Sequence, residues 1–568
     1  MVFSYFQKEL GYTKHMLNMF RNTIRKHKVA ILILYVVFGI YFLFLFGRML
    51  YVKPDGLYAG NMNVWSDWSL HIGMAKLFAE KSPNDWFAYH PMYAHGKFTY
   101  GFLTNFISGM LMRMGVSLIN AFVIPSFVYI MLFIFALYAL YFLLMRSKKI
   151  ALFAIFIFML SGGPGFYLFL KDFASSPSWE KLLYPTTYSD YHEYQWFEGN
   201  FIEGLLVPQR AFLLGSTISL WIMVGVFSVF LHGSVLKKMQ KRWILFFCGM
   251  SAGLLPITHM HSFMVLVFVS AFLAFSLLKE WKLLLYYGIP AGIISTILYF
   301  TFVFGGIENP SFMQIDWGWS ASSFVEWVFM WAKIWGVFLP LALWGLCVKW
   351  KDLRKEARAV FLSFFSLFVV ANIILFQPIH WDNSKIFTWS YLGLSPLVAS
   401  LFLWLWKQRY AKVITILLFL SVVGSGFLEL YRMQRIDRNS YRMISNDEMV
   451  LAEEVKKNTD PRAIFLTEPT HNHWVMMWAQ RPILMGYTAW VWNFGFLYNQ
   501  TEQDLQKMFQ GTADALTLLE QYGIHYVVIG PGELYGLNAN ESFYISRFPV
   551  AFQNENYRVY DVREVFEK

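Results

Sequence analysis

A carboxylate and an imidazole stand four residues apart in the segment Trp65-Ser66-Asp67-Trp68-Ser69-Leu70-His71. On a helix, residues at this spacing share one face. An aspartate beside a histidine can act as a general base assisted by the imidazole. A helix-capping aspartate and an interfacial histidine fit the same pattern. Asp67 and His71 are the candidate catalytic residues.

A second polar segment, Gln-Pro-Ile-His-Trp-Asp-Asn-Ser-Lys at 377–385, joins two apolar runs, with Lys385 at the start of the second run. A helix N-terminus carrying a lysine attracts anions. A plain helix cap by Asp382 or Asn383 is the alternative. We favour phosphate binding by Lys385 and Asn383, with His380 and Asp382 contributing to substrate binding.

Three further basic or imidazole side chains are candidates for the same phosphate. Arg210 stands at the end of an apolar run, where it could clamp a phosphate or extend to the membrane surface. His259 and His261 lie in Thr-His-Met-His at 258–261. Two histidines without an evident third ligand do not make a metal site. We therefore expect hydrogen bonds to substrate or phosphate, predict no metal site, and leave a divalent cation open as a cofactor.

Aromatic and polar residues also collect in two long loops. His90, His95 and Tyr100 are candidate substrate-binding residues. The segment 188–198 interleaves aromatic rings with carboxylates. Such a mixture suits a carbohydrate, because rings stack on sugar faces and carboxylates accept hydroxyl hydrogens. An aromatic belt at the membrane interface is the alternative.

The amino-acid composition indicates which kind of protein carries these candidate residues. Of 568 residues, 57% are hydrophobic and only 15% are charged, against roughly 25% charged in soluble domains. A soluble chain cannot bury that much apolar surface, so the sequence predicts a multi-pass α-helical membrane protein. The net charge of +11 comes from clusters between apolar runs. This pattern indicates membrane orientation and argues against nucleic-acid binding. Cys248 and Cys347 lie in apolar runs, so no disulfide is expected.

The apolar runs predict about eleven transmembrane helices within a domain at 29–430. They are 29–50, 118–145, 150–170, 211–236, 243 to an interruption at 256–261, 262–278, 283–306, 321–348, 359–376, 385–406 and 413–430. Basic clusters precede the first run or follow even-numbered ones, whereas the short junctions 258–261, 307–320 and 377–384 contain no Lys or Arg. This alternation predicts a cytoplasmic N-terminus at 1–28, outer loops at 51–117 and 171–210, and residence in the plasma membrane. The stretch 98–114 fits either a re-entrant or an additional helix.

The segment 431–568 has a different composition and predicts a small α/β domain outside the membrane. Ser445 is the expected cap of a first helix. Strands are expected at 463–467, 524–529 and 557–562, and an amphipathic helix at 502–522. The segments 471–474 and 486–493 could line an acceptor path, although ordinary packing explains each of their residues equally well.

Taken together, these features resemble the GT-C superfamily of integral-membrane glycosyltransferases. The resemblance rests on the many spans, the large first outer loop, the position of Asp67 after the first span, the segment His90–Gly96 with Tyr100, and the external tail. It implies a polyprenyl-phosphate or polyprenyl-diphosphate sugar donor and places on Asp67 the role of base or acceptor-orienting acid. The chain departs from the two-acid pattern of several branches, because His71 stands where a second acid is expected and Asp85 is the next candidate. The branch and its metal requirement therefore stay open.

The implied reaction is an inverting displacement at the anomeric carbon, with Asp67 taking the proton of the acceptor hydroxyl. Lys385, Arg210 and one of the two histidines at 259–261 would stabilise the leaving phosphate. The partners would be the lipid-linked sugar, a lipid, glycan or protein acceptor, and the membrane, without nucleic acid. The alternatives are a transporter or flippase, or a non-catalytic assembly protein. A transporter usually carries ionisable residues at the membrane midplane and repeated halves, and this sequence shows neither.

Overall fold

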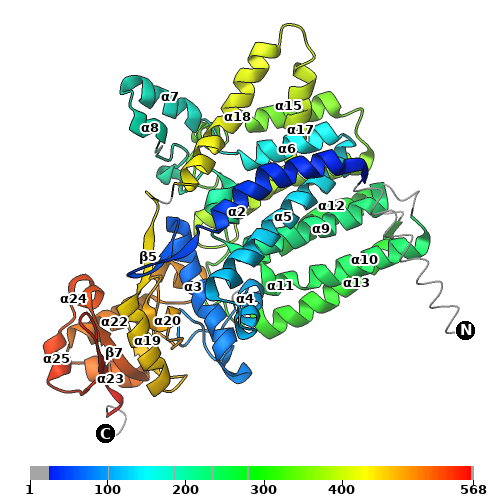
Figure 1. Cartoon of the computed structure of the whole chain (residues 1–568). Helices are drawn as coiled ribbons and strands as arrows, with labels where there is room; N and C mark the ends of the chain where they lie inside the picture. Colours follow the sequence, from blue (N-terminus) through cyan, green and yellow to red (C-terminus); the bar gives the residue numbers. More distant parts are fainter. Residues whose placement is uncertain are drawn as a thin grey trace, which may run out of the picture.

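The computed structural model describes residues 25–99, 101–183, 186–231, 236–277, 280–435 and 437–564. Figure 1 shows a bundle of long helices with the C-terminal α/β domain at one end, next to α3. Within the described residues, six helical segments are long and apolar enough to cross a membrane. They are Arg25–Phe46, Leu118–Met145 (α5), Arg210–Leu231 (α9), Trp281–Val303 (α13 with a π-helical end), His380–Leu405 and Lys412–Met433 (α18). These confirm a multi-pass helical architecture.

The remaining predicted spans are helical but short or bent. The run 321–348 forms α14 (Phe324–Ile334) and α15 (Phe338–Lys349), which meet at 88°. Four others form helices of 12 to 17 residues: α6 (Lys148–Met159), α10 (Lys238–Gly253), α12 (Met260–Ser276) and α16 (Lys355–Ala371). Six spans, or seven with the bent pair, satisfy length and composition among the described residues. The count of eleven therefore stays a prediction.

Glycine explains where two predicted spans differ in extent from the helices of the structure. The run 150–170 breaks after α6, because Gly163 has a φ of +62° and a side chain there would meet the Ile334 carbonyl oxygen at 2.3 Å. The chain restarts as α7 (Gly165–Ser175) outside the candidate spans. The bend between α14 and α15 contains Gly336, whose φ is +59°. Both positions use left-handed backbone that glycine adopts without strain.

The first outer loop folds into a hairpin and two packed helices. Its elements are β1 (Leu50–Lys53), β2 (Gly56–Ala59), α3 (Met62–Glu80) and α4 (Leu103–Arg113). The Asn61 side chain caps α3 by accepting a hydrogen bond from the Asn63 amide at 2.8 Å. Gly109 lets α4 approach α3, since a Cβ there would lie 2.6 Å from the Phe78 Cβ. The ambiguous stretch 98–114 thus forms an eleven-residue helix, which is too short to cross a bilayer.

The C-terminal segment forms the expected α/β elements. Its four-stranded sheet has the order β6-β7-β9-β8 and comprises Ile464–Leu466, Ile524–Ile529, Arg558–Asp561 and Val550–Gln553. Ser445 caps α19 (Asn446–Asn458) in a capping box with Glu448, as predicted. The helix expected at 502–522 is two helices, α22 (Asn499–Gln510) and α23 (Ala515–Gln521), because α22 ends at left-handed Gly511. The remaining helices are α20 (Trp474–Met477), α21 (Thr488–Asn493), α24 (Pro531–Gly536) and α25 (Glu541–Ile545).

A shared sheet joins the first outer loop to the C-terminal segment. Strand β5 (Tyr441–Ser445) pairs antiparallel with β2, giving the order β1-β2-β5. A side chain at Gly56 would collide with the Ile444 carbonyl oxygen at 2.2 Å. The two outer parts of the chain are therefore hydrogen-bonded to each other through their backbones. The domain boundary at residue 431 stays a prediction.

A buried ion cluster fastens the second outer loop to the end of α18. The Arg432 guanidinium lies 2.9 Å from Glu198, 2.6 Å from Glu203 and 2.9 Å from Glu429. Glu429 also accepts hydrogen bonds from Ser189 at 2.6 Å and from Thr187. Burial raises the pKa of Glu203, which Arg432 opposes. One arginine thus holds three carboxylates together.

Replacing Arg432 with methionine should destabilise the protein, because carboxylates would stay buried without their counter-charge. Breaking a buried ion pair typically costs about 3 kcal/mol or more, which should appear as a lower melting temperature of the purified protein in detergent. Arg438→Met is the matched control, since Arg438 contacts Glu180 at 3.4 Å with both side chains more than half exposed. Equal melting temperatures for the two variants would contradict a stabilising role for the cluster.

Candidate active site

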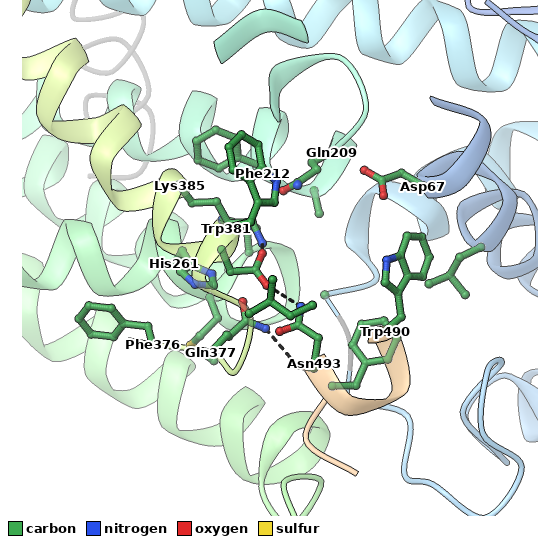
Figure 2. A pocket seen from close by; sticks show the side chains of 18 of the residues that line it. Asp67, Gln209, Phe212, His261, Phe376, Gln377, Trp381, Lys385, Trp490 and Asn493 are labelled. Atoms are coloured by element: carbon green, nitrogen blue, oxygen red, sulfur yellow. Dashed lines mark hydrogen bonds and ion pairs between the residues drawn. The ribbon is translucent and has the colours of Figure 1, made fainter. Parts of the chain in front are cut away.

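A cavity of about 630 Å³ lies where the outer loops, the membrane helices and the C-terminal domain meet. Figure 2 shows Asp67 on one side of this cavity and Lys385, Trp381 and His261 on the other, with Trp490 and Asn493 entering from α21. Among the sequence candidates, the lining contains Asp67, His71, His259, His261, Asp382 and Lys385. The structure therefore brings together residues from three separate segments of the sequence.

The α3 wall presents the expected carboxylate and imidazole on one face. Asp67 and His71 both line the cavity. No hydrogen bond or ion pair reaches the Asp67 carboxylate from the described part of the chain. Burial raises the pKa of Asp67 to about 7, although the positive charge of Lys385 opposes this shift. Burial and the charge of Arg210 lower the pKa of His71 to about 3, so the imidazole stays neutral near pH 7.

The opposite wall is organised by an ion pair at the start of α17 (Ser384–Leu405). The Lys385 ammonium pairs with one oxygen of Asp382, and the Asn493 side chain donates to the other oxygen. Both charged side chains are largely buried, at 11% and 6% exposure. The side chain of Gln377 donates to the Asn493 backbone oxygen at 3.2 Å. This wall therefore combines a membrane helix with the C-terminal domain.

Asn383 supports this wall from behind. Its amide group donates to the backbone oxygens of Ala371 at 2.8 Å and Ile374 at 2.7 Å, and accepts a hydrogen bond from the Phe376 amide. These contacts fix the 3-10 turn His380–Asn383 that leads into α17. Asn383 does not line the cavity and supports the turn that carries Asp382 and Lys385, so phosphate contact by Asn383 stays a prediction.

Several buried polar atoms in the lining lack a partner within the described residues. They are His261 Nε2, Gln377 Oε1 and Asn493 Oδ1. A buried polar atom without a hydrogen bond typically costs about 1–3 kcal/mol, and a polar ligand would satisfy it. His259, in contrast, accepts a hydrogen bond from the Ser262 amide at 3.2 Å and caps α12. His261 is thus better placed than His259 to contact a ligand.

Arg210 lies behind the cavity. Its side chain is fully buried, donates to Ser108 at 2.6 Å and Ser126 at 3.2 Å, and places its guanidinium 4.1 Å from the Phe122 ring centre. Arg210 does not line the cavity. These contacts hold the guanidinium between α4, α5 and α9, and its role as a phosphate clamp stays a prediction.

Three histidines among the sequence candidates, His90, His95 and His380, also lie outside the cavity lining. His90 is buried, accepts the Met92 amide at 3.2 Å, and packs against Phe494. His95 lies beside the backbone oxygen of Tyr522 at 3.2 Å. His380 pairs with Asp316 at 2.8 Å. These contacts give the three histidines roles in packing and at the surface, and substrate contact by them stays a prediction.

The predictions for Tyr100 and for a bound metal ion stay open. Tyr100 falls outside the residues that the structure describes. Within the described residues, no group of three His, Cys, Asp or Glu side chains could hold a metal ion. A metal requirement is therefore not assigned to any residue.

The sequence predicts the segments 471–474 and 486–493 as possible lining of an acceptor path, with ordinary packing as the alternative. His471, Tyr487, Trp490 and Asn493 all line the cavity, as does Gln377. The aromatic segment at 486–493 was a visible signal. Its orientation toward the membrane domain could not be predicted, because it depends on the docking of a separate sheet.

The raised pKa of Asp67 predicts a pH-dependent chemical reactivity. A hydrophobic carbodiimide modifies protonated carboxyl groups in apolar surroundings. With a pKa of about 7, Asp67 should be protonated about ten to one at pH 6 and ionised about ten to one at pH 8. Peptide mass spectrometry should therefore find much stronger labelling of Asp67 at pH 6, and none in Asp67→Asn. Equal labelling at both pH values would contradict the raised pKa.

This chain resembles known proteins in its three-dimensional structure but not in its sequence. No protein-family model and no curated protein sequence matches this chain. The oligosaccharyltransferase of Archaeoglobus fulgidus, crystallised with a tethered acceptor peptide, matches with a TM-score of 0.55 and 9% identity, over 89% of this chain and 69% of that one. The same enzyme, AglB, in complex with an inhibitory peptide and a dolichol-phosphate, matches with a TM-score of 0.50 and 10% identity, over 90% and 70% of the two chains.

ArnT from Cupriavidus metallidurans is similar over a greater share of its own length. It matches with a TM-score of 0.50 and 10% identity, over 94% of this chain and 97% of that one. The oligosaccharyltransferase and ArnT are both GT-C superfamily glycosyltransferases. The resemblance inferred from the sequence is confirmed at the level of architecture: this chain has the fold of the GT-C glycosyltransferases.

Proposed function

We propose that this protein is a membrane glycosyltransferase that moves a sugar from a polyprenyl-phosphate or polyprenyl-diphosphate donor to an acceptor hydroxyl. The observation that carries the proposal is the unpartnered Asp67 carboxylate facing a cavity whose other wall holds the Lys385 ammonium (Figure 2). The fold it shares with the oligosaccharyltransferase and ArnT supports the same reaction class. The acceptor would be a lipid, a glycan or a protein.

The reaction would be a displacement with inversion at the anomeric carbon. The acceptor oxygen forms a bond to that carbon while the bond between the carbon and the phosphate oxygen breaks. The electron pair of the broken bond passes to the lipid phosphate, and the hydroxyl proton passes to the Asp67 carboxylate. A base with a pKa of about 7 is well matched to this role at neutral pH.

The leaving phosphate would be held by the opposite wall. Lys385 is fixed by Asp382 but keeps further N–H donors, and it lines the cavity together with His261. A positive charge in a site shielded from water stabilises a developing phosphate anion more than it could in bulk water. AglB has been solved in complex with an inhibitory peptide and a dolichol-phosphate, which supports a lipid phosphate as the group bound here. The described residues contain no evident metal-holding group, so no step is assigned to a metal.

The predicted orientation places this cavity on the extracytoplasmic side of the plasma membrane. The N-terminus would lie in the cytoplasm, and the outer loops and C-terminal domain would lie outside. This orientation follows from the alternating basic clusters. It would give the protein access to lipid-linked sugars in the outer leaflet.

Asp67→Asn should lower the transfer rate by about a hundredfold to ten-thousandfold, the usual contribution of a general base. The measurement is transfer of radiolabelled sugar from polyprenyl-phosphate sugars in proteoliposomes. Asp55→Asn is the matched control, because Asp55 lies in the same outer loop but is exposed beside Tyr58 and Arg442. Full activity of a folded Asp67→Asn protein would overturn the assignment.

The same assay gives a pH profile. Since Asp67 must be ionised to accept a proton, the wild-type rate should rise with pH through about 7 and then level off. A rate that falls as pH rises from 6 to 8 would argue against Asp67 as base. Movement of the labelled lipid across the membrane without bond formation would favour a transporter.

Lys385→Met should abolish transfer by removing the cation from the phosphate site. That change would leave the Asp382 carboxylate buried without its ion-pair partner and could unfold the protein. The double variant Lys385→Met/Asp382→Asn removes both charges, so it tests the loss of the cation without leaving an unpaired buried charge. Lys333→Met is the control, since Lys333 contacts Glu193 on an exposed surface. Wild-type activity of the double variant would show that this wall does not bind the donor phosphate.

A further inference from the structure

The C-terminal domain contributes a continuous aromatic surface to the cavity. His471 and Tyr487 stack with ring centres 3.7 Å apart, and Trp490 meets His471 edge-on at 5.1 Å. Burial lowers the pKa of His471 to about 4, so this ring is uncharged at neutral pH. Trp490 extends from α21 toward the part of the cavity that contains Asp67 (Figure 2). An uncharged aromatic wall offers its surface to apolar C–H groups.

A pair of amide side chains continues this surface. Gln377 donates to the backbone oxygen of Asn493, and Asn493 donates to Asp382. One N–H of each amide is thus engaged, while Gln377 Oε1 and Asn493 Oδ1 are buried without partners among the described residues. Both oxygens are hydrogen-bond acceptors. A ligand with O–H or N–H groups would satisfy them, whereas a carboxylate oxygen, which is itself an acceptor, could not.

The amide pair adjoins the proposed phosphate site. Asn493 contacts one oxygen of Asp382, and Lys385 contacts the other. In a lipid-phosphate sugar, the sugar ring is bonded directly to the phosphate. If the donor phosphate binds at Lys385, the attached sugar ring would therefore lie next to Asn493.

We infer that Trp490, Gln377 and Asn493 form the subsite for the donor sugar, and that this sugar is an uncharged pyranose with free hydroxyl groups. The ring face packs on Trp490, and the hydroxyls donate to the two amide oxygens. The C-terminal domain, which supplies Trp490 and Asn493, thereby selects the sugar. This inference rests on the proposed function, because Lys385 must hold the donor phosphate.

The test compares the binding of lipids that differ only in the sugar. Full-length protein in nanodiscs is titrated with polyprenyl phosphate, and with the same lipid carrying glucose, mannose, N-acetylglucosamine or glucuronic acid. Native mass spectrometry measures each affinity. At least one neutral sugar should strengthen binding over the bare phosphate, and the glucuronic acid lipid should bind more weakly than that neutral one.

Substitutions in the proposed sugar subsite test whether its residues cause the stronger binding of the neutral sugar lipid. Trp490→Ala should reduce the gain from the neutral sugar by about tenfold, the effect of losing one interaction of about 1.4 kcal/mol, while affinity for polyprenyl phosphate stays the same. Trp490→Phe should retain part of the gain. Trp492→Ala is the matched control, because Trp492 lies on the same helix but does not line the cavity. In this variant, the neutral sugar should strengthen binding over polyprenyl phosphate as much as it does in the wild type.

The outcomes separate this inference from the proposed function. If the wild type binds polyprenyl phosphate but no neutral sugar improves the affinity, or if Trp490→Ala keeps the full gain, the sugar subsite is overturned and the phosphate site stands. If the wild type does not bind polyprenyl phosphate at all, the proposed function fails, and the inference fails with it.

Discussion

The buried pair of Lys385 and Asp382 is the interaction on which the cavity depends. A lone ammonium or carboxylate is costly to bury, and a close partner with further hydrogen bonds offsets this cost. Asp382 supplies the counter-charge, and Asn493 satisfies its second oxygen. Because Asn493 belongs to the C-terminal domain, the same contacts hold a cation at the cavity wall and dock that domain onto the membrane helices. Charge placement and domain placement are therefore linked in this fold.

The two walls of the cavity each carry an aspartate, but the surroundings of the two carboxylates differ. The carboxylate on α3 has no partner within the described residues, whereas the carboxylate at 382 is committed to its lysine and asparagine. Burial raises the pKa of the first to about 7. The carboxylate on α3 is thus able to exchange a proton near neutral pH, while the carboxylate at 382 contacts Lys385 and Asn493. Two aspartates in one cavity acquire different roles through their neighbours alone.

Local patterns in the sequence were sufficient to predict part of this arrangement. The spacing of Asp67 and His71 predicted a shared helix face, and the lysine at the start of a buried helix predicted a cationic helix end. Both signals depend only on neighbouring residues and helical geometry. The long spans α5 and α18 were predictable from their apolar length for the same reason. The hydrogen bonds of Arg210 could not be predicted in this way, because its partners, Ser108 and Ser126, lie on other helices.

Long-range packing explains what the sequence could not provide. The contribution of Trp490 and Asn493 depends on how a sheet far along the chain docks, which no local pattern specifies. The breaks at Gly163 and Gly336 were hidden inside apolar runs, where hydropathy stays high although the backbone turns. Predictions from apolar length therefore overestimate continuous spans wherever glycine permits a bend.

The pairing of β2 with β5 has a consequence for the order in which the protein is built. The first outer loop is synthesised early, yet its strand β2 completes its hydrogen bonds only when β5 has emerged. The wall carrying Trp490 and Asn493 follows later still. A nascent or truncated chain would insert its helices and expose Asp67, but it would have an open sheet edge and an unfinished cavity. The cavity can therefore be completed only after the C-terminal segment has been synthesised, so that an incomplete chain would have membrane helices but no closed cavity.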